Sequence, residues 1–495
     1  MQPTGAVQSM FQTGWQAHRQ GRLDEAASAY EQVLRLEPRH FAALHMLGVV
    51  WRQRGDSPRA AELIARAIDV NPKVAAAYIN LGNALQDLGR PREALMHFDK
   101  ALAMQPGMAE IHLNRGNALS DLYRYAEAVS AYDAALRLNP GLAEAHSYRA
   151  KALHELGRLE EALAGHDAAL ALRPDFGDAW FSKAETQLLL GDLKNGWDSY
   201  EWRKRKAGRP AANRVYPQPL LMSPAGLEGK TVLVHWEQGL GDALQGARYL
   251  RLLEEAGARV LFAPQPQLRT LMGGLDGAVS IVEADDPAQA FDLHVPLLSL
   301  PRIFASTLET IPARIPYLRA PAGHVARWRE RIGSHGFKIG ICWQGNPAYK
   351  LDAARRSFPL CLFEGLSRLD GVRLISVHKG VGESQMLTLP DGMRVETPGP
   401  DFAAGPDGFL DTAAVISVMD LVITSDTVIP HLAGAMGAPV WTALAKIPDW
   451  RWLLERSDSP WYPTMRLFRQ KQFGDWAGVM GEIEAALREK LRAHA

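Results

Sequence analysis

The first residues that could do chemistry lie in the stretch TVLVHWEQGLGDALQGARYL, residues 231–250. A strand-like apolar run, Thr231–His235, precedes a turn with Gly239 and Gly241, and a helical pattern begins at Asp242. A strand, a glycine turn and a helix N-terminus direct backbone N–H groups toward an anion and leave room for a ligand. Asp242 could therefore contact a ligand bound at this turn, or it could be an ordinary aspartate at a helix start.

A second turn of this kind lies in LVITSDTVIPHLAGAMGAPVW. The run Leu421–Thr424 predicts a strand, and Ser425, Asp426 and Thr427 follow it at the turn. Thr427 and the free N–H groups of the next helix would meet a diphosphate, and His431, one turn further, would reach a phosphate or a ribose. Asp426 would cap the helix or orient a ligand hydroxyl. The alternative is that Asp426 or Thr427 is only an N-cap.

Other candidates for ligand contact share a position just past predicted strand ends: Trp343, Asn346, Arg356, Ser357, His378 and Lys379. Arg356, Ser357 and Lys379 could meet the negative charge that develops on a leaving phosphate, whereas a surface ion pair is the alternative for Arg356. His378 and Lys379 could instead frame a base and ribose. Trp343 and Asn346 could contact sugar or base, or Trp343 could belong to the core.

We expect neither a metal nor a bound cofactor. No His, Cys and Asp residues have metal-ligand spacing, and there is no Asp-X-Asp of the kind that metal-dependent transferases use. The glycines after Thr231–His235 read G-L-G-D, not G-x-G-x-x-G, which disfavours a nucleotide-sugar epimerase or dehydrogenase. Cys342 and Cys361 are the only cysteines, so a disulfide framework is excluded and a reducing compartment is favoured.

The elements that position these residues alternate between apolar runs and helical patterns, which predicts parallel sheets covered by helices. The expected strands are Thr231–His235, Ala258–Ala263, Val279–Val282, Phe291–Val295, Lys338–Trp343, Arg373–His378, Leu421–Ser425 and Val440–Leu444. Expected helices include Ala243–Ala256 and Trp476–Arg492, and a proline-rich passage at 296–321 separates two halves. Two doubly wound halves facing one cleft would hold a ligand at the strand ends of both.

The first 200 residues contain a repeat. Prolines occur at 38, 72, 106, 140 and 174, a constant spacing of 34, and glycines follow the same period at 21, 55, 89, 157 and 191, with Tyr123 at the missing position. Small residues recur at Ala26, Ala60, Ala94, Ala128 and Ala162. This period resembles the tetratricopeptide repeat, whose helix pairs stack into a superhelix with a concave, protein-binding face.

Four asparagines occupy equal positions in two neighbouring repeats: Asn80, Asn83, Asn114 and Asn117. They could bind the backbone of an extended peptide in the groove, or Asn83 and Asn117 could merely cap or space helices. The last unit carries Trp197, Tyr200 and Trp202, which we expect to cap the stack or dock the next domain. We interpret the basic run 203–209 as a solvated linker rather than a nucleic-acid patch.

The composition is that of a globular protein, with 47% hydrophobic and 22% charged residues. Lys plus Arg and Asp plus Glu both total 55, so no global charge favours nucleic acid or anionic membrane. No apolar run approaches the length of a membrane helix, and the N-terminus lacks the pattern of a signal peptide. These features predict a cytoplasmic protein without a transmembrane segment.

The motifs GLGD (239–242), GICWQGNP (340–347), RRSFPL (355–360), SVHKG (376–380) and SDTVIPHLAGAMG (425–437), in this order, resemble those of bacterial heptosyltransferases. The whole chain resembles bacterial tetratricopeptide-repeat proteins fused to such a domain, of the glycosyltransferase family 9 type. The resemblance implies a GT-B fold of two Rossmann-like domains, with Asp242 as general base and with Asp426, Thr427 and His431 in contact with a nucleotide-sugar. Val428 departs from the glycine that the family often has there, which puts the donor or the activity in question.

The predicted organisation is therefore tetratricopeptide repeats over 1–207, a linker over 208–229, an acceptor-side Rossmann-like domain over 230–322 and a nucleotide-sugar domain over 323–495. The predicted function is metal-independent hexosyl or heptosyl transfer from a nucleotide-sugar, as co-substrate, to a hydroxyl on a protein or glycan that the repeats recruit. The alternative is a non-catalytic scaffold of repeats with a degenerate GT-B domain.

Overall fold

The computed structural model describes residues 3–205, 214–284, 286, 289–346 and 355–493. The chain divides into two compact units, Met1–Ser182 and Lys183–Ala495. This division falls inside a helix, and it groups the end of the predicted repeat region with the α/β part. The domain boundaries that we drew at 207, 229 and 322 stay predictions, and the first residues of the expected linker, 208–213, lie outside the described residues.

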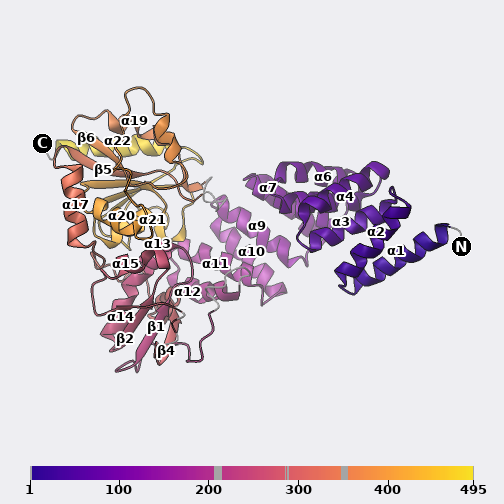
Figure 1. The fold of residues 1–495 in the computed structure, drawn as a ribbon, viewed down its shortest axis with the longest axis horizontal. Helices are drawn as coiled ribbons and strands as arrows, with labels where there is room; N and C mark the ends of the chain where they lie inside the picture. The colour runs from indigo at the N-terminus through magenta and orange to yellow at the C-terminus, as the bar shows by residue number, and fades with distance from the viewer. Residues whose placement is uncertain (1–2, 206–213, 285, 287–288, 347–354, 494–495) are drawn as a thin grey trace. The chain divides into compact units, whose positions relative to one another are not determined.

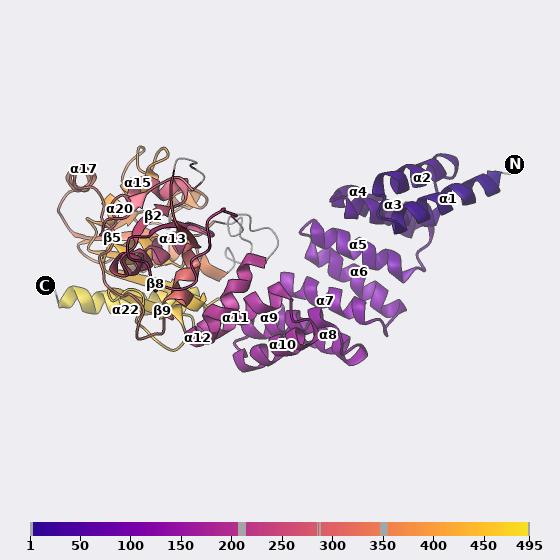
Figure 2. The ribbon, with the colours of Figure 1, turned by 90° about the horizontal axis from the view of Figure 1, so that it is seen from below.

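Helices alone make up the described chain before residue 206, in agreement with the predicted repeats (Figure 1). They are α1 (Pro3–Arg19), α2 (Leu23–Leu36), α3 (Phe41–Gln53), α4 (Ser57–Val70), α5 (Ala75–Asp87), α6 (Pro91–Met104), α7 (Ala109–Asp121), α8 (Tyr125–Leu138), α9 (Ala143–Glu155), α10 (Leu159–Leu172), α11 (Gly177–Leu189), α12 (Leu193–Tyr200) and the short 3-10 helix η1 (Glu201–Arg205). Each pair from α1–α2 to α9–α10 packs together, and each pair from α1–α2 to α7–α8 also packs against the pair that follows it. Figure 2 shows the same succession from below.

The turns between paired helices explain the repeated glycines. Gly21, Gly55, Gly89, Gly157 and Gly191 all have φ between 69° and 84°, the left-handed region that glycine enters without strain. Tyr123 adopts the same conformation with φ 60°. The prediction that Tyr123 occupies the turn position of the missing glycine is therefore confirmed. The recurring alanines from Ala26 to Ala162 are fully buried between helices, as expected for close packing.

A four-stranded parallel sheet begins the α/β part, and we call residues 214–321 the first lobe. Its strands are β1 (Thr231–His235), β2 (Arg259–Ala263), β3 (Ser280–Ile281) and β4 (Leu293–Pro296), in the spatial order β3-β2-β1-β4. Val234 of β1 lies beside Phe262 of β2 and Val295 of β4. The order reverses between β1 and β4, so the ends of these two strands flank the crevice where parallel sheets bind ligands.

A five-stranded parallel sheet forms the second lobe, residues 322–493. Its strands are β5 (Phe337–Cys342), β6 (Val372–Ser376), β7 (Leu421–Ser425), β8 (Val440–Leu444) and β9 (Met465–Arg469), in the order β6-β5-β7-β8-β9. The eight predicted strands are therefore confirmed to within a few residues, but β9 was not predicted. The chain reverses its order between β5 and β7, where Ile341 lies beside Ile423.

Helices cover both sheets. They are α13 (Leu240–Gly246), η3 (Ala247–Tyr249), α14 (Leu250–Glu255), η4 (Pro266–Leu268), α15 (Arg269–Met272), η5 (Leu297–Ser299), α16 (Leu300–Ile303), α17 (Ala322–Ile332), η6 (Leu360–Phe363), α19 (Glu364–Ser367), η7 (Glu383–Leu387), α20 (Gly408–Ile416), α21 (Val428–Ala435), η8 (Trp450–Trp452) and α22 (Trp476–Arg492). The prediction of one continuous helix over Ala243–Ala256 was wrong, because η3 interrupts it. The α22 prediction is confirmed at both ends.

The second unit is therefore an α/β structure with two parallel sheets, as predicted in its coarse form. Within the described residues, no helix combines the length and the apolar character that crossing a bilayer requires.

Candidate functional site

The ends of β5 and β7 form the centre of the candidate site in the second lobe. These strands are neighbours at the point where the strand order reverses, so the segments after Cys342 and Ser425 lie side by side. The Sγ atom of Cys342 lies 3.9 Å from Oγ1 of Thr427, which joins the two segments directly. The predicted residues of both motifs thus converge on one edge of the sheet.

Asp426 lies in a cluster of alternating charges. Its Oδ2 atom is 3.5 Å from Nε of Arg356, and Nη2 of the same guanidinium is 3.5 Å from Oδ2 of Asp449. Burial raises the pKa of Asp426, and Arg356 opposes this shift. For Asp449, burial acts in the same direction, but Arg451 and Arg356 outweigh it and lower the pKa to about 2. Arg356 is therefore paired with two carboxylates, a geometry that a phosphate could share.

Arg451 connects this cluster to the first lobe. Its guanidinium donates to Oδ1 of Asp449 at 2.9 Å, to Oε1 of Gln245 at 2.5 Å and to Oδ1 of Asp242 at 2.5 Å. The other carboxylate oxygen of Asp242 accepts a hydrogen bond from the backbone N–H of Gly239 at 2.6 Å. Both oxygens of the predicted base are therefore occupied, one by its own turn and one by the opposite lobe.

His431 on α21 packs against the glycine turn of α13. A Cβ atom on Gly241 would lie only 2.8 Å from Cδ2 of His431, so a side chain there would separate the two helices. The imidazole lies 3.0 Å from the hydroxyl of Tyr462 through Nδ1 and stacks on Trp452 with ring centroids 5.1 Å apart. Burial lowers its pKa well below the usual value, so this histidine is neutral at pH 7.

Thr427 is the N-cap of α21. Its Oγ1 atom accepts from the backbone N–H of Ile429 at 3.2 Å, so the N-cap interpretation describes its state in this structure. Val428, the departure from the family pattern, is the first residue of the helix. Ser425 is fully buried, and its hydroxyl has no hydrogen-bond partner among the described residues.

The remaining predicted residues lie at different depths. Trp343 is fully buried with its ring 4.3 Å from that of His378, which supports the core alternative for the tryptophan. His378 is buried too; burial lowers its pKa, and its Nε2 lies 2.8 Å from the carbonyl of Val381. Lys379 is exposed and pairs with Glu383 at 3.3 Å.

Ser357 and Asn346 belong to the edges of the segment that follows β5. The Ser357 hydroxyl accepts from the backbone N–H of Gly345 at 3.1 Å, whereas Asn346 is exposed. Pro347, the last residue of the motif GICWQGNP, lies outside the described residues.

Several buried charged residues near the site were missed by sequence reasoning: Arg203, Glu237, Arg248, Asp449 and Arg451. Our interpretation of the run from Arg203 as solvated was wrong for that residue, because its guanidinium is enclosed and paired with Glu237 at 2.6 Å. Residues 206–209 of the run lie outside the described part. The one signal available was the tryptophan-rich stretch PDWRW around Asp449 and Arg451.

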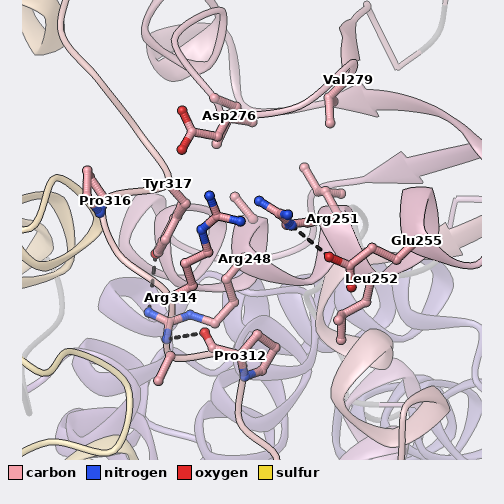
Figure 3. Close-up of a pocket in the computed structure, with 14 residues that line it drawn as sticks. Arg248, Arg251, Leu252, Glu255, Asp276, Val279, Pro312, Arg314, Pro316 and Tyr317 are labelled. Carbon is pink, nitrogen blue, oxygen red and sulfur yellow. Dashed lines mark hydrogen bonds and ion pairs between the residues drawn. The ribbon is translucent and has the colours of Figure 1, made fainter.

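Arg248 holds the first lobe to the segment that leads into the second. It donates to the carbonyl of Pro312 at 3.1 Å and to the hydroxyl of Tyr317 at 3.3 Å, as Figure 3 shows, and to the carbonyl of Trp461 at 2.5 Å. Arg248, Pro312 and Tyr317 border a cavity of about 250 Å³ in the first lobe. Asp242 does not line this cavity, so it is separate from the candidate site.

In the repeat unit, two of the four predicted groove asparagines already have partners on other helices. Asn80 lies 2.8 Å from Nε2 of His45, and Asn117 accepts from the hydroxyl of Tyr132 at 2.8 Å. Asn83 and Asn114 are half-buried on α5 and α7. Peptide binding by these four residues stays a prediction.

A metal site finds no support in the part of the chain that the structure describes, because no three His, Cys, Asp or Glu side chains gather there in a way that could hold an ion.

Comparison with known families identifies the repeats. A model of the tetratricopeptide repeat matches residues 11–77, 79–143 and 113–166. The N-terminal part of the chain is therefore a run of tetratricopeptide repeats, and such repeats indicate protein partners.

One curated relative is the protein FlbA of Caulobacter vibrioides, which is 30% identical over 335 residues. The match covers 62% of this chain and 54% of FlbA, so the chain spans about half the length of this relative.

Among solved structures, MamA is 24% identical with a TM-score of 0.31, over 32% of this chain and 94% of MamA. YrrB, a tetratricopeptide-repeat protein with an unusual peptide-binding site, is 21% identical with a TM-score of 0.33, over 37% of this chain and 98% of YrrB.

Proposed function

We propose that the α/β unit is a glycosyltransferase of the GT-B type, which moves a sugar from a nucleotide-sugar to a hydroxyl acceptor. The observation that carries this proposal is the meeting of the two predicted motifs. Asp242 of the first lobe contacts Arg451 of the second, and Gly241 packs on His431. Strand ends from two parallel sheets thus face each other, the arrangement in which α/β proteins bind nucleotides.

The proposed chemistry needs a base beside the acceptor hydroxyl and positive charge beside the diphosphate of the donor. The acceptor hydroxyl attacks the anomeric carbon, its proton passes to the carboxylate of Asp242, and the bond from that carbon to the diphosphate oxygen breaks. Arg356, Arg451 and the N–H groups at the start of α21 would stabilise the departing nucleoside diphosphate. No metal enters this scheme, since the cations are side chains of the chain itself.

Arg451 gives the scheme a binding-dependent step. It bonds Asp242 and Asp449 in the described structure. A diphosphate carries more charge than either carboxylate and would compete for the guanidinium. If the guanidinium of Arg451 bonded to the diphosphate of the donor, it would release one oxygen of Asp242 for the acceptor hydroxyl. The base would then become free only when the donor is present.

The repeats suggest how the acceptor is chosen. Because tetratricopeptide repeats hold proteins or peptides on a concave face, we propose that they recruit a protein acceptor or a protein that carries the glycan. The asparagines at 80, 83, 114 and 117 are our candidates for that contact. Their present bonds to His45 and Tyr132 would have to be shared or exchanged when a peptide binds.

A second candidate is a scaffold whose α/β unit binds a ligand without turnover. The observation in its favour is that both oxygens of Asp242 are engaged, by Gly239 and by Arg451. Val428 at the start of α21 adds support, since a side chain there narrows the approach of a diphosphate.

Calorimetry with a panel of nucleoside diphosphates on the full chain, followed by hydrolysis assays with the matching nucleotide-sugars, tests the proposal. We expect one diphosphate to bind in the micromolar range and its sugar derivative to be hydrolysed slowly. Binding without turnover on any donor would favour the scaffold. Absence of binding by every diphosphate would remove the nucleotide site.

A further inference from the structure

The segment formed by α12 and η1, at the end of the repeat region, presents one face to the α/β unit. Trp197, Tyr200 and Arg203 are spaced by three residues and all are buried. The indole Nε1 of Trp197 donates to the carbonyl of Ser306 at 3.0 Å. The expectation that aromatic residues here dock the next domain is met by Trp197 and Tyr200.

Arg203 enters the crevice at the reversal point of the first sheet. Its guanidinium forms two hydrogen bonds to the carboxylate of Glu237, at 2.8 and 2.6 Å, and one to the hydroxyl of Ser299 at 2.8 Å. Glu237 follows β1 and Ser299 follows β4, the two strands between which the order reverses. Both charged side chains of the pair are fully buried, 0% exposed. A ligand would be expected in this crevice, yet the chain's own arginine fills it.

Tyr200 contacts Gln238, which lies in the chain between Glu237 of that ion pair and the glycine turn. Its hydroxyl accepts from Nε2 of Gln238 at 3.1 Å. The same ring and that of Trp197 pack on Trp450 of the second lobe, with centroids 6.0 and 5.3 Å away. Trp450 precedes Arg451, so this segment contacts the neighbours of both partners in the Asp242–Arg451 pair.

We propose that Tyr200 and Arg203 are positioning residues of the candidate site, which fix the Gly239–Asp242 turn through Gln238 and Glu237. The α12–η1 segment then borders the acceptor side of the site and contributes to its activity. The statement about activity rests on the proposed function. Two hydrogen bonds from a buried arginine to one carboxylate fix both the position and the orientation of that carboxylate, whereas an apolar contact would not fix its orientation.

Amide hydrogen exchange on the full chain, without ligand, tests the positioning directly. The first variant is Tyr200→Phe, which removes one hydroxyl, and the second is the double variant Arg203→Met with Glu237→Met, which leaves no unpaired charge. Asp198→Asn is the matched control, because it removes the charge of the exposed ion pair between α12 and Arg302 and leaves the turn untouched. We expect exchange at the amides of residues 239–243 to rise about tenfold in both variants and to stay unchanged in the control.

Unchanged exchange in the turn, or a rise spread evenly over β7 and α3, would overturn the positioning role. A second readout is donor hydrolysis, in which Tyr200→Phe should lower kcat at least fivefold while the donor KM stays within about twofold. A rise in the donor KM of at least about fivefold with an unchanged kcat would also contradict the inference. If the wild-type chain hydrolyses no donor, the proposed function fails, and the exchange result still decides whether this segment orders the turn.

Discussion

The carboxylate of Asp242 and the guanidinium of Arg451 meet at 2.5 Å although they belong to different lobes and are separated by 209 residues. Arg451 is nearly enclosed, and burial acts to lower its pKa while Asp449 and Asp242 outweigh this and raise it. The two lobes therefore share a buried ion pair beside the glycine turn.

Replacing Arg451 by methionine should destabilise the α/β unit. The change leaves the carboxylates of Asp242 and Asp449 without their common partner, and loss of one member of a buried pair costs about 3–5 kcal/mol. Urea unfolding followed by tryptophan fluorescence measures the change. Arg302→Met is the control, since its pair with Asp198 is exposed, and we expect a loss of less than about 1 kcal/mol there. Similar losses in both variants would contradict the account.

Gly241→Ala tests the close approach of α13 and α21. The added methyl group would meet the imidazole of His431 at 2.8 Å, so one of the helices must shift. We expect a loss of about 1–3 kcal/mol in the free energy of unfolding, as for overpacked cores. Gly323→Ala in α17 is the matched control, because a Cβ there has no neighbour within 4 Å. An unchanged unfolding midpoint for Gly241→Ala would show that the helices are not held this closely.

The pH dependence of stability should depend on His431. Burial lowers its pKa in the folded state, so below about pH 6.5 the unfolded chain binds a proton that the folded chain does not. The stabilising contribution is complete above that pH and is lost as the pH falls toward the folded pKa. Comparing Tm at pH 7.5 and pH 5.0, we expect a smaller decrease for His431→Gln than for the wild type. The control is His18→Gln in α1 of the repeat unit, for which we expect the same decrease as in the wild type. Equal decreases in all three proteins would refute this assignment.

The sequence predicted those features that depend on residues close together in the chain. The period of 34 located the repeats because each proline, glycine and alanine has a local role in a turn or helix contact. The apolar runs located eight strands, since a buried parallel strand such as Leu421–Ser425 is apolar on both faces. Turn residues located the two helix starts to within about two residues: α13 begins at Leu240, two residues before the predicted start at Asp242, and α21 begins at Val428, directly after Thr427.

The features that were missed depend on tertiary contacts. Arg203 and Arg451 resemble surface arginines in the sequence, and only the approach of Glu237 and Asp242 makes their burial possible. The strand β9 carries an exposed arginine at position 466, which weakens its apolar signal. The break of the predicted helix at Ala247 directly follows Gly246, where a Cβ atom would lie only 2.8 Å from the side chain of Leu297.

Tyr123 offers a test of the repeat analysis that is independent of the site. It occupies the left-handed turn position that glycine fills in the other repeats, with φ 60°. Tyr123→Gly should relieve this conformation and stabilise the repeat unit by about 0.5–1 kcal/mol, after the entropy cost of glycine is included. Local hydrogen exchange in α7 and α8 measures the effect. Gly157→Ala at the equivalent position, φ 77°, should destabilise its own helix pair by a similar amount. A loss of stability in Tyr123→Gly would contradict this reading of the turn.

The central claim is that the Gly239–Asp242 turn and the Asp426–His431 segment together bind and turn over a nucleotide-sugar. The most direct measurement compares the wild-type chain with Asp242→Ala for diphosphate binding by calorimetry and for sugar transfer or donor hydrolysis in the same preparation. The account predicts binding within about threefold of wild type and turnover reduced by about 10²–10⁴-fold, the range that a general base contributes. Equal turnover in the two proteins would contradict it and would remove Asp242 from the mechanism.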